Sequence, residues 1–261
     1  MGVLNVTPDS FFDGGNYLAV DNALQHALSL IQQGADIIDI GGESAKPYAK
    51  QVSLEVELTR VIPVIKKLRR ESDVCISIDT YKPEVMQAAV EAGANIINDI
   101  YALRQPGALT MAAQLAVPVC LMHMQGEPSN MQQNPYYRHG VVDEICQFFT
   151  ERIKACELAG INKNLLLLDP GFGFGKLIKD NLQLVYNLQE FFTLGMPILL
   201  GISRKNTIGA ILDKETDQRL IGSLTLALFS AMKGVGILRT HDVDETRQAL
   251  KILEMLYQEN S

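Results

Sequence analysis

The chain has 261 residues, of which 47% are hydrophobic and 20% charged, a composition that supports a large core and excludes disorder. Its net charge of −7, from 23 basic and 30 acidic residues, argues against broad binding to nucleic acid or anionic membranes. No apolar run approaches the ~20 residues of a membrane span. We therefore expect one globular domain over residues 1–261, with neither nucleic acid nor membrane as partner.

The cysteines of the chain form no CxxC pair and lie in predicted strands or helices. They are Cys75, Cys120, Cys146 and Cys156. Such spacing is typical of structural thiols in a reducing compartment. No signal-peptide pattern precedes the first predicted strand. We therefore expect a cytoplasmic protein.

Eight short apolar runs each end at, or just before, a residue able to do chemistry. In chain order, the strands are predicted near residues 3–5, 37–39, 76–79, 96–99, 119–123, 165–169, 198–201 and 236–239. Continuous apolar runs of about four residues suit strands that are buried on both faces of a parallel sheet. The polar residues would then gather at one end of the sheet.

A helical pattern follows each predicted strand. Asp21 is the expected N-cap of the first helix, Ser53 opens the second, and Pro83 starts the third. The other helices are expected near 107–116, 143–159, 181–194, 219–233 and 244–258. Unbroken alternation of eight strands with helices predicts a (β/α)8 TIM barrel, an α/β fold whose active site lies at the C-terminal ends of the strands.

Four polar side chains would enter the mouth of this barrel: Asp79, Asn98, Asp169 and Lys205. A carboxylate in a low-dielectric site needs donors. The amine and ring N–H of an aminopyrimidinone form a fork that a carboxylate can accept twice, and Lys205 would donate to the ring's carbonyl or imine nitrogen. The alternative is that these residues are strand-end polar groups satisfied within the protein.

The end of the eighth strand predicts an anion site. Arg239 and His241, two residues apart, would share a face if the strand stays extended, and both can donate to a phosphate. Asn5 offers a neutral oxygen suited to hydrated Mg²⁺. The alternatives are that Arg239 pairs with Asp242 or Asp244 and that Asn5 forms a turn.

The glycine-rich run at 169–176 is not a nucleotide-binding loop, because Pro170 and Leu177 occupy the positions of its first glycine and its hydroxyl residue. The glycines would instead let the backbone approach a flat ligand, with Phe174 as a wall for an aromatic substrate. His123 has no second histidine or cysteine at ligand spacing, so we expect it to be packed at the end of its strand.

At these residues the sequence resembles the dihydropteroate synthases. The matching stretches are LNVTPDSFFDGG at 4–15, GADIIDIGGES at 34–44, SIDTYKPEV at 77–85, GANIINDI at 93–100, LMHMQGEP at 121–128, LLLDPGFGFGK at 166–176, GISRKNTIG at 201–209 and LRTHDV at 238–243. They follow one another in order over nearly the whole chain. The family joins 6-hydroxymethyl-7,8-dihydropterin diphosphate to 4-aminobenzoate with Mg²⁺, releasing pyrophosphate and forming 7,8-dihydropteroate.

The resemblance also implies a role for individual residues. It assigns pterin binding to Asp79, Asn98, Asp169 and Lys205, diphosphate binding to Asn5, Lys46, Arg239 and His241, metal binding to Asn5, and the aminobenzoate pocket to Phe11, Ala45, Pro47, Phe174, Arg204 and Asn206. It implies that Lys205, Arg239 and His241 carry the catalysis, because they stabilise the charge that develops on the leaving diphosphate.

One loop departs from the family pattern. Where the family usually has Ser-Thr-Arg-Pro-Gly, this chain has Ser44-Ala45-Lys46-Pro47-Tyr48, which removes a hydroxyl and replaces a planar fork by a point charge. This departure leaves a non-catalytic or weakly active pterin-binding paralogue as an alternative. A pterin-dependent corrinoid methyltransferase is a second one, although its family lacks the Ser-Arg-Lys and Arg-Thr-His segments found here.

The helix predicted after the seventh strand is apolar on more sides than a helix that lies on a barrel needs. The run Leu220-Ile221-Gly222-Ser223-Leu224-Thr225-Leu226-Ala227-Leu228-Phe229 carries this pattern. An exposed apolar face commonly marks a subunit interface. We therefore expect a homodimer.

Overall fold

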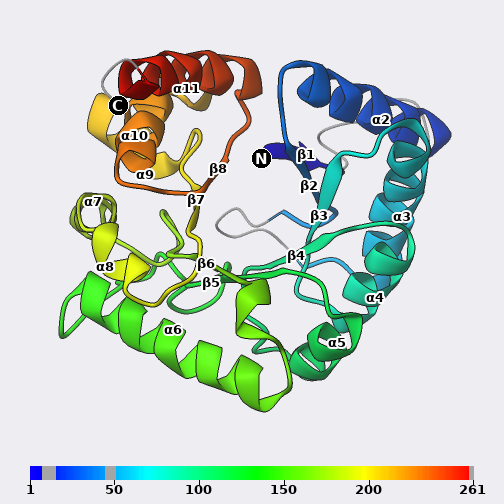
Figure 1. Cartoon of the computed structure of the whole chain (residues 1–261), viewed down its shortest axis with the longest axis horizontal. Helices are drawn as coiled ribbons and strands as arrows, with labels where there is room; N and C mark the ends of the chain where they lie inside the picture. The colour runs from blue at the N-terminus through cyan, green and yellow to red at the C-terminus, as the bar shows by residue number, and fades with distance from the viewer. Residues whose placement is uncertain (8–15, 45–50, 259–261) are drawn as a thin grey trace.

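Eight parallel strands surround the centre of the molecule in the computed structural model, which describes residues 1–7, 16–44 and 51–258 (Figure 1). The strands are β1 (Gly2–Asn5), β2 (Ile37–Gly41), β3 (Cys75–Asp79), β4 (Ile96–Asp99), β5 (Val119–Met122), β6 (Leu166–Asp169), β7 (Leu199–Gly201) and β8 (Ile237–Arg239). Each coincides with one of the predicted apolar runs, so the strand prediction is confirmed.

Two isolated bridges close the strands into a barrel. Strands β1 to β6 form one parallel sheet, and β7 pairs with β8. Leu168 bridges to Ile198, and Gly2 bridges to Thr240. The amide N–H of Val3 also donates to the carbonyl oxygen of Thr240 across the second junction, at 3.0 Å. The predicted (β/α)8 barrel is therefore the observed fold.

The helices lie outside the strands (Figure 1). They are α2 (Asn16–Gln32), α3 (Leu54–Glu71), α4 (Pro83–Glu91), α5 (Ala108–Leu115), α6 (Val141–Leu158), α7 (Ile178–Tyr186), α8 (Gln189–Phe192), α9 (Asn206–Leu212), α10 (Leu220–Met232) and α11 (Val243–Gln258), with short 3-10 helices at η1 (Lys163–Leu165) and η2 (Thr216–Gln218). No helix within the described ranges is long and apolar enough to span a membrane.

The sequence placed most helix ends correctly but misplaced two. Ser53 caps α3 by accepting from the amide N–H of Val56, and Pro83 is the first residue of α4. Asp21 is not an N-cap: α2 begins five residues earlier, and the Asp21 carboxylate pairs with Lys67 of α3 instead. The helix expected over 181–194 is two helices, α7 and α8, separated at Asn187 and Leu188.

The strand register brings the polar strand ends to one level. Asn5 pairs with Gly41, Gly41 with Asp79, and Asp79 with Asn98, across β1 to β4. Gly201 likewise pairs with Arg239 across β7 and β8. Because parallel strands end on the same side of the barrel, these residues share its C-terminal mouth.

Candidate active site

Arg239 is held in the barrel mouth by two carboxylates from neighbouring strands. Its Nε donates to Asp39 Oδ2 at 2.6 Å, and its Nη2 donates to Asp79 Oδ2 at 2.8 Å. Asn98 Nδ2 also donates to Asp39 Oδ2, at 3.1 Å. The alternative that Arg239 pairs with Asp242 or Asp244 is wrong. Its Nη1 makes no hydrogen bond within the described part of the chain, so this group can still donate to a ligand.

Burial governs the protonation of this cluster. It raises the pKa of Asp79 to about 7, although the positive charge of Arg239 opposes the shift. Burial alone would lower the pKa of Arg239, but Asp39 and Asp79 more than offset it and raise this pKa. Arg239 therefore stays charged, while Asp79 lies close to a proton equilibrium at neutral pH.

Lys205 enters the same mouth from the loop after β7. Its Nζ lies 3.8 Å from the centroid of the Phe174 ring, a cation–π distance, and makes no hydrogen bond within the described ranges. Burial lowers the pKa of Lys205 to about 7, and the negative charge of Asp169 opposes this shift. The two residues that sequence assigned to pterin recognition on this side thus influence each other electrostatically.

Asp169 ends β6 with one carboxylate oxygen already engaged. Its Oδ1 accepts from the amide N–H of Gly171 at 2.8 Å, whereas no hydrogen bond to Oδ2 occurs within the described residues. Burial raises the pKa of Asp169, and the Gly171 N–H and the charge of Lys205 oppose the increase. A ligand that supplies two donors can therefore reach Oδ2 and share Oδ1.

His241 lies just beyond the end of β8, on the exposed rim. Its Nδ1 is 3.1 Å from Ser203 Oγ, and its backbone N–H donates to the same hydroxyl at 3.2 Å. Desolvation, followed by the positive charges of Arg239 and Arg204, lowers the pKa of His241 to about 4. The imidazole is therefore neutral at pH 7 and can donate one N–H to an anion or offer a lone pair to a cation.

Arg204 is fixed by the turn that follows β8. Its guanidinium forms two hydrogen bonds to the Asp242 carboxylate, and its φ of +58° is left-handed. Its backbone N–H donates to Ser223 Oγ at 2.9 Å. Asn206 begins α9, and its Oδ1 accepts from Arg219 at 3.0 Å. Both predicted aminobenzoate residues thus already have protein partners.

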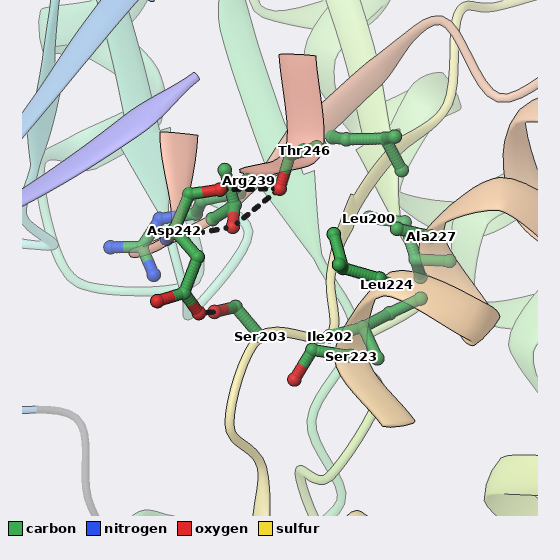
Figure 2. A pocket seen from close by; sticks show the side chains of 11 residues that line it. Leu200, Ile202, Ser203, Ser223, Leu224, Ala227, Arg239, Asp242 and Thr246 are labelled. Carbon is green, nitrogen blue, oxygen red and sulfur yellow. Dashed lines mark hydrogen bonds between the residues drawn. The ribbon is translucent and has the colours of Figure 1, made fainter. Parts of the chain in front are cut away.

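A small pocket lies behind this turn, between β7 and β8 on one side and α10 and α11 on the other (Figure 2). Asp242 lines it together with Ser203 and Thr246, and Thr246 Oγ1 donates to the Asp242 carbonyl at 2.6 Å. Its opposite wall is apolar, from Leu200, Leu224 and Ala227. These contacts fix Asp242, and Asp242 in turn fixes Arg204 at the rim.

Asn5 ends β1 half-buried, and its side chain forms no hydrogen bond within the described part of the chain. No group of three or more His, Cys, Asp or Glu side chains able to hold a metal occurs in residues 1–7, 16–44 and 51–258. The side-chain oxygen of Asn5 suits a cation that is held by one or two protein atoms and by a bound ligand, as Mg²⁺ often is. Phe11, Ala45, Lys46 and Pro47 lie outside the described residues.

Two charged residues of the site were assigned no role from the sequence. Asp39 is fully buried and accepts from both Arg239 and Asn98, a role indicated by a lone charge within the apolar run Ile37-Ile38-Asp39-Ile40. Lys176 is also buried, and its Nζ is 3.0 Å from Nδ1 of His123. His123 is packed at its strand end, as predicted.

The glycines of the 169–176 run serve the protein's own packing. A Cβ atom on Gly171 would lie 1.9 Å from the carbonyl oxygen of His123, and one on Gly175 would lie 2.5 Å from that of Gln125. Both glycines also have positive φ. The close approach expected toward a flat ligand is thus made toward the loop after β5.

Charged groups with shifted pKa values at the mouth of a barrel are typical of an enzyme's active site, and comparison with known proteins identifies the class of enzyme. A family model described as a pterin binding enzyme matches residues 1–241. The dihydropteroate synthase of Escherichia coli is 51% identical over 254 residues, covering 97% of this chain and 90% of that protein. The Haemophilus influenzae dihydropteroate synthase is 50% identical over 252 residues, covering 97% of this chain and 91% of that protein.

Solved structures lead to the same family. Yersinia pestis dihydropteroate synthase in a sulfonamide drug complex superposes with a TM-score of 0.94 at 50% identity, covering 99% of this chain and 94% of that one. The Xanthomonas albilineans enzyme in complex with 7,8-dihydropteroate gives 0.90 at 49% identity, covering 98% and 92%. The chain belongs to the dihydropteroate synthase family.

Proposed function

We propose that this protein condenses 6-hydroxymethyl-7,8-dihydropterin diphosphate with 4-aminobenzoate to give 7,8-dihydropteroate and pyrophosphate, the dihydropteroate synthase reaction. Residues 1–261 would form one pterin-binding barrel domain. The observation that carries the proposal is the joint placement of Asp79, Asn98, Asp169 and Lys205 at one barrel mouth. Family membership and relatives named for this reaction support it.

The pterin would bind to the polar groups that the barrel mouth leaves available. Asp169 offers Oδ2 and part of Oδ1 to the ring's amine and N–H, forming the double acceptor that such a fork needs. Asn98 would meet the opposite edge of the ring. Lys205, whose Nζ contacts the Phe174 ring and makes no hydrogen bond to the part of the chain that the structure describes, would donate to a ring carbonyl or imine nitrogen.

The diphosphate would lie near the end of β8. Arg239 is held at Nε and Nη2 by its two carboxylates, and Nη1 of this rigid group would donate to the anion. Neutral His241, with Nδ1 against Ser203, would donate from Nε2. Lys46 would add a further positive charge. Donors fixed in this way stabilise charge as it develops on a leaving group without reorganising.

Mg²⁺ is the metal that we propose for this site. Asn5 would supply an amide oxygen, and its side chain, which forms no hydrogen bond within residues 1–7, 16–44 and 51–258, fits that role. When bound together with the diphosphate, the cation would lower the charge of the leaving group.

The reaction needs no protein nucleophile. The bond between the pterin methylene carbon and the diphosphate oxygen breaks first, and pyrophosphate keeps the electron pair. The aniline nitrogen of 4-aminobenzoate then bonds to the methylene carbon and loses a proton. Phe174, Arg204 and Asn206, with Phe11, Ala45 and Pro47, would form the aminobenzoate pocket beside the methylene, where a dry site prevents capture by water.

We further propose that the active form is a homodimer. Helix α10 exposes large apolar side chains: Ile221 is 77% exposed and Met232 is 59% exposed. This pattern supports an interface on that face. Light scattering at micromolar concentration should give about twice the 28.8 kDa of the chain, and a value of one chain mass would reject the dimer.

The cytoplasm is the compartment that we propose. All four cysteines are free thiols, and Cys120 and Cys156 are buried, which fits a reducing environment. Fractionation of the source cells, with the protein detected by antibody, tests this placement.

One assay tests the central proposal. Purified protein is incubated with the pterin diphosphate, 4-aminobenzoate and Mg²⁺, and dihydropteroate is measured by chromatography. Turnover that requires all three components is the expected result. Pterin binding without turnover would identify a non-catalytic paralogue instead, and methyl transfer from a pterin to a corrinoid protein would identify the methyltransferase alternative.

A further inference from the structure

The buried ammonium group of Lys176 has acceptors in three directions. Its Nζ donates to the carbonyl oxygens of Gly171 at 2.8 Å and Phe174 at 3.0 Å. Nδ1 of His123 lies 3.0 Å away, on the loop after β5. The carbonyl oxygen of His123 is a further, longer acceptor at 3.4 Å. Burial lowers the pKa of Lys176 to about 7, and the negative charge of Asp169 opposes this shift. In its ammonium form Nζ has three N–H donors and no acceptor, so this set satisfies all of them. The side chain is 3% exposed and does not face the barrel mouth's solvent.

His123 is suited to be the third acceptor. Burial, followed by the positive charge of Lys176, lowers the pKa of His123 well below its ordinary value. The imidazole is therefore neutral, and a neutral ring with its proton on Nε2 leaves Nδ1 free to accept. The edge of the ring packs against Phe148, with centroids 4.9 Å apart. The acceptor is thus fixed by packing on α6.

The segment held by Lys176 touches two of the site residues. Gly171 donates from its N–H to Asp169 Oδ1 while its carbonyl accepts from Lys176. The Phe174 ring packs against Nζ of Lys205. Gly173 also lies close to the Lys205 side chain, since a Cβ atom at Gly173 would lie 3.1 Å from Cδ of Lys205. Lys176 therefore binds the backbone segment that contacts both Asp169, an acceptor of the proposed pterin site, and Lys205, a donor of that site.

We propose that Lys176, with His123 as its acceptor, is a positioning residue: together they hold segment 171–175 in the conformation in which Asp169 and Lys205 are both aligned for the pterin. The inference rests on the proposed function and deepens it, because it assigns a task to a buried lysine that touches no substrate. Without the ammonium group, two carbonyls lose their shared donor, and the segment populates other conformations.

The proposal predicts a division between binding and turnover. If only a fraction of the molecules has the aligned segment, the apparent dissociation constant rises by the inverse of that fraction. Saturating ligand selects the aligned state, so turnover at saturation is largely retained. In Lys176→Met, which keeps the length of the side chain but lacks donors, we expect KM for the pterin diphosphate to rise at least about tenfold. We expect kcat to stay within about threefold.

The comparison uses three further variants. Ile65→Ala, in the core on α3, is the control for lost stability alone. If its melting temperature decreases about as much as that of Lys176→Met, its KM values for the pterin diphosphate and for 4-aminobenzoate should still be unchanged. His123→Gln retains an acceptor for Lys176, whereas His123→Leu does not. We expect the Leu variant to reproduce the effect of Lys176→Met and the Gln variant to stay within about threefold of the native KM.

The outcomes are decisive. A folded Lys176→Met with native KM values, or with decreased kcat and unchanged KM, overturns the proposal. If that variant does not fold, equal KM values in His123→Gln and His123→Leu overturn it. Should native protein show no turnover, the proposed function fails, and calorimetric Kd values for the pterin diphosphate in the same variants still decide the positioning role.

Discussion

The two sides of the barrel mouth hold their cations in different ways. On the β2, β3 and β8 side, Arg239 is fixed by two carboxylates at 2.6 and 2.8 Å. On the β6 and β7 side, Lys205 rests on an aromatic ring, and Lys176 is bound by backbone carbonyls and an imidazole. The cation of the first side, Arg239, keeps its charge, whereas burial lowers the pKa of both lysines on the second side to about 7, so their charge depends on pH.

This difference matches the two tasks that the proposed reaction requires. A leaving diphosphate needs a positive charge that is in place before the bond breaks, and a guanidinium between carboxylates provides it. A pterin ring needs donors and acceptors that reach it after it enters. Lys205, with no hydrogen bond of its own in the described residues, is free to make that contact. The asymmetry suggests variants that separate the two tasks.

The largest effect is expected on the lysine side, at Asp169. Asp169→Asn replaces one oxygen of the double acceptor by a donor that faces a donor, which should weaken pterin binding by roughly 2–5 kcal/mol. Calorimetric titration with the pterin diphosphate measures this change. Affinity within twofold of the native protein would show that the ring binds elsewhere. The neighbouring arginine should keep its two ion pairs in this variant.

On the arginine side, Arg239→Ala should lower kcat/KM by about two to three orders of magnitude, because a donor that stabilises the leaving group is lost. It also leaves Asp39 and Asp79 buried without their counter-ion. The variant should no longer show pyrophosphate-enhanced binding of 4-aminobenzoate. Steady-state kinetics and an aminobenzoate titration with and without pyrophosphate measure both effects, and near-normal turnover would assign the leaving group to another residue.

The sequence was sufficient to predict the barrel and the placement of Asp79, Asn98 and Asp169 at its mouth, but not how the site residues pair. Apolar runs ending at Asp79, Asn98 and Asp169 locate these residues at one end of the sheet, since strand period and chain order determine it. The partner of Arg239 could not be predicted, because Asp39 lies 200 positions away and meets it only through barrel closure. Asp21 was mistaken for a cap because its true partner, Lys67, lies on another helix.

The sequence at 44–48 offers a smaller change. Ala45 lacks a hydroxyl, Lys46 replaces an arginine fork, and Tyr48 is bulkier than glycine, so we expect active enzyme with weakened aminobenzoate binding and sulfonamide binding weakened more. The triple variant Ala45→Thr, Lys46→Arg, Tyr48→Gly should lower the ratio of the sulfonamide inhibition constant to the KM for 4-aminobenzoate about 10–100-fold. An unchanged ratio would make the loop a neutral variation.

The smallest expected effect is a pH dependence of the unfolding free energy, which has opposite signs for Lys205 and Asp79. The pKa of Lys205 is about 7 in the folded protein against an ordinary value of 10.5, so between these values the unfolded chain binds more protons. Stability contributed by this group is therefore full above about pH 10.5 and is lost as pH falls toward 7. Asp79, with its pKa raised to about 7, has the opposite sign: its contribution is lost as pH rises from 3.8 to 7.

Urea unfolding of native protein and Lys205→Met at pH 7 and pH 8 isolates the lysine contribution. Asp79 and Lys176 titrate in both proteins, so the difference reports Lys205 together with the shift that its charge causes in the pKa of Lys176. The unfolding free energy of the native protein should rise relative to the variant by about 1 kcal/mol over this one pH unit. A difference that stays constant would mean that Lys205 remains fully protonated over this range and keeps its charge, as Arg239 does.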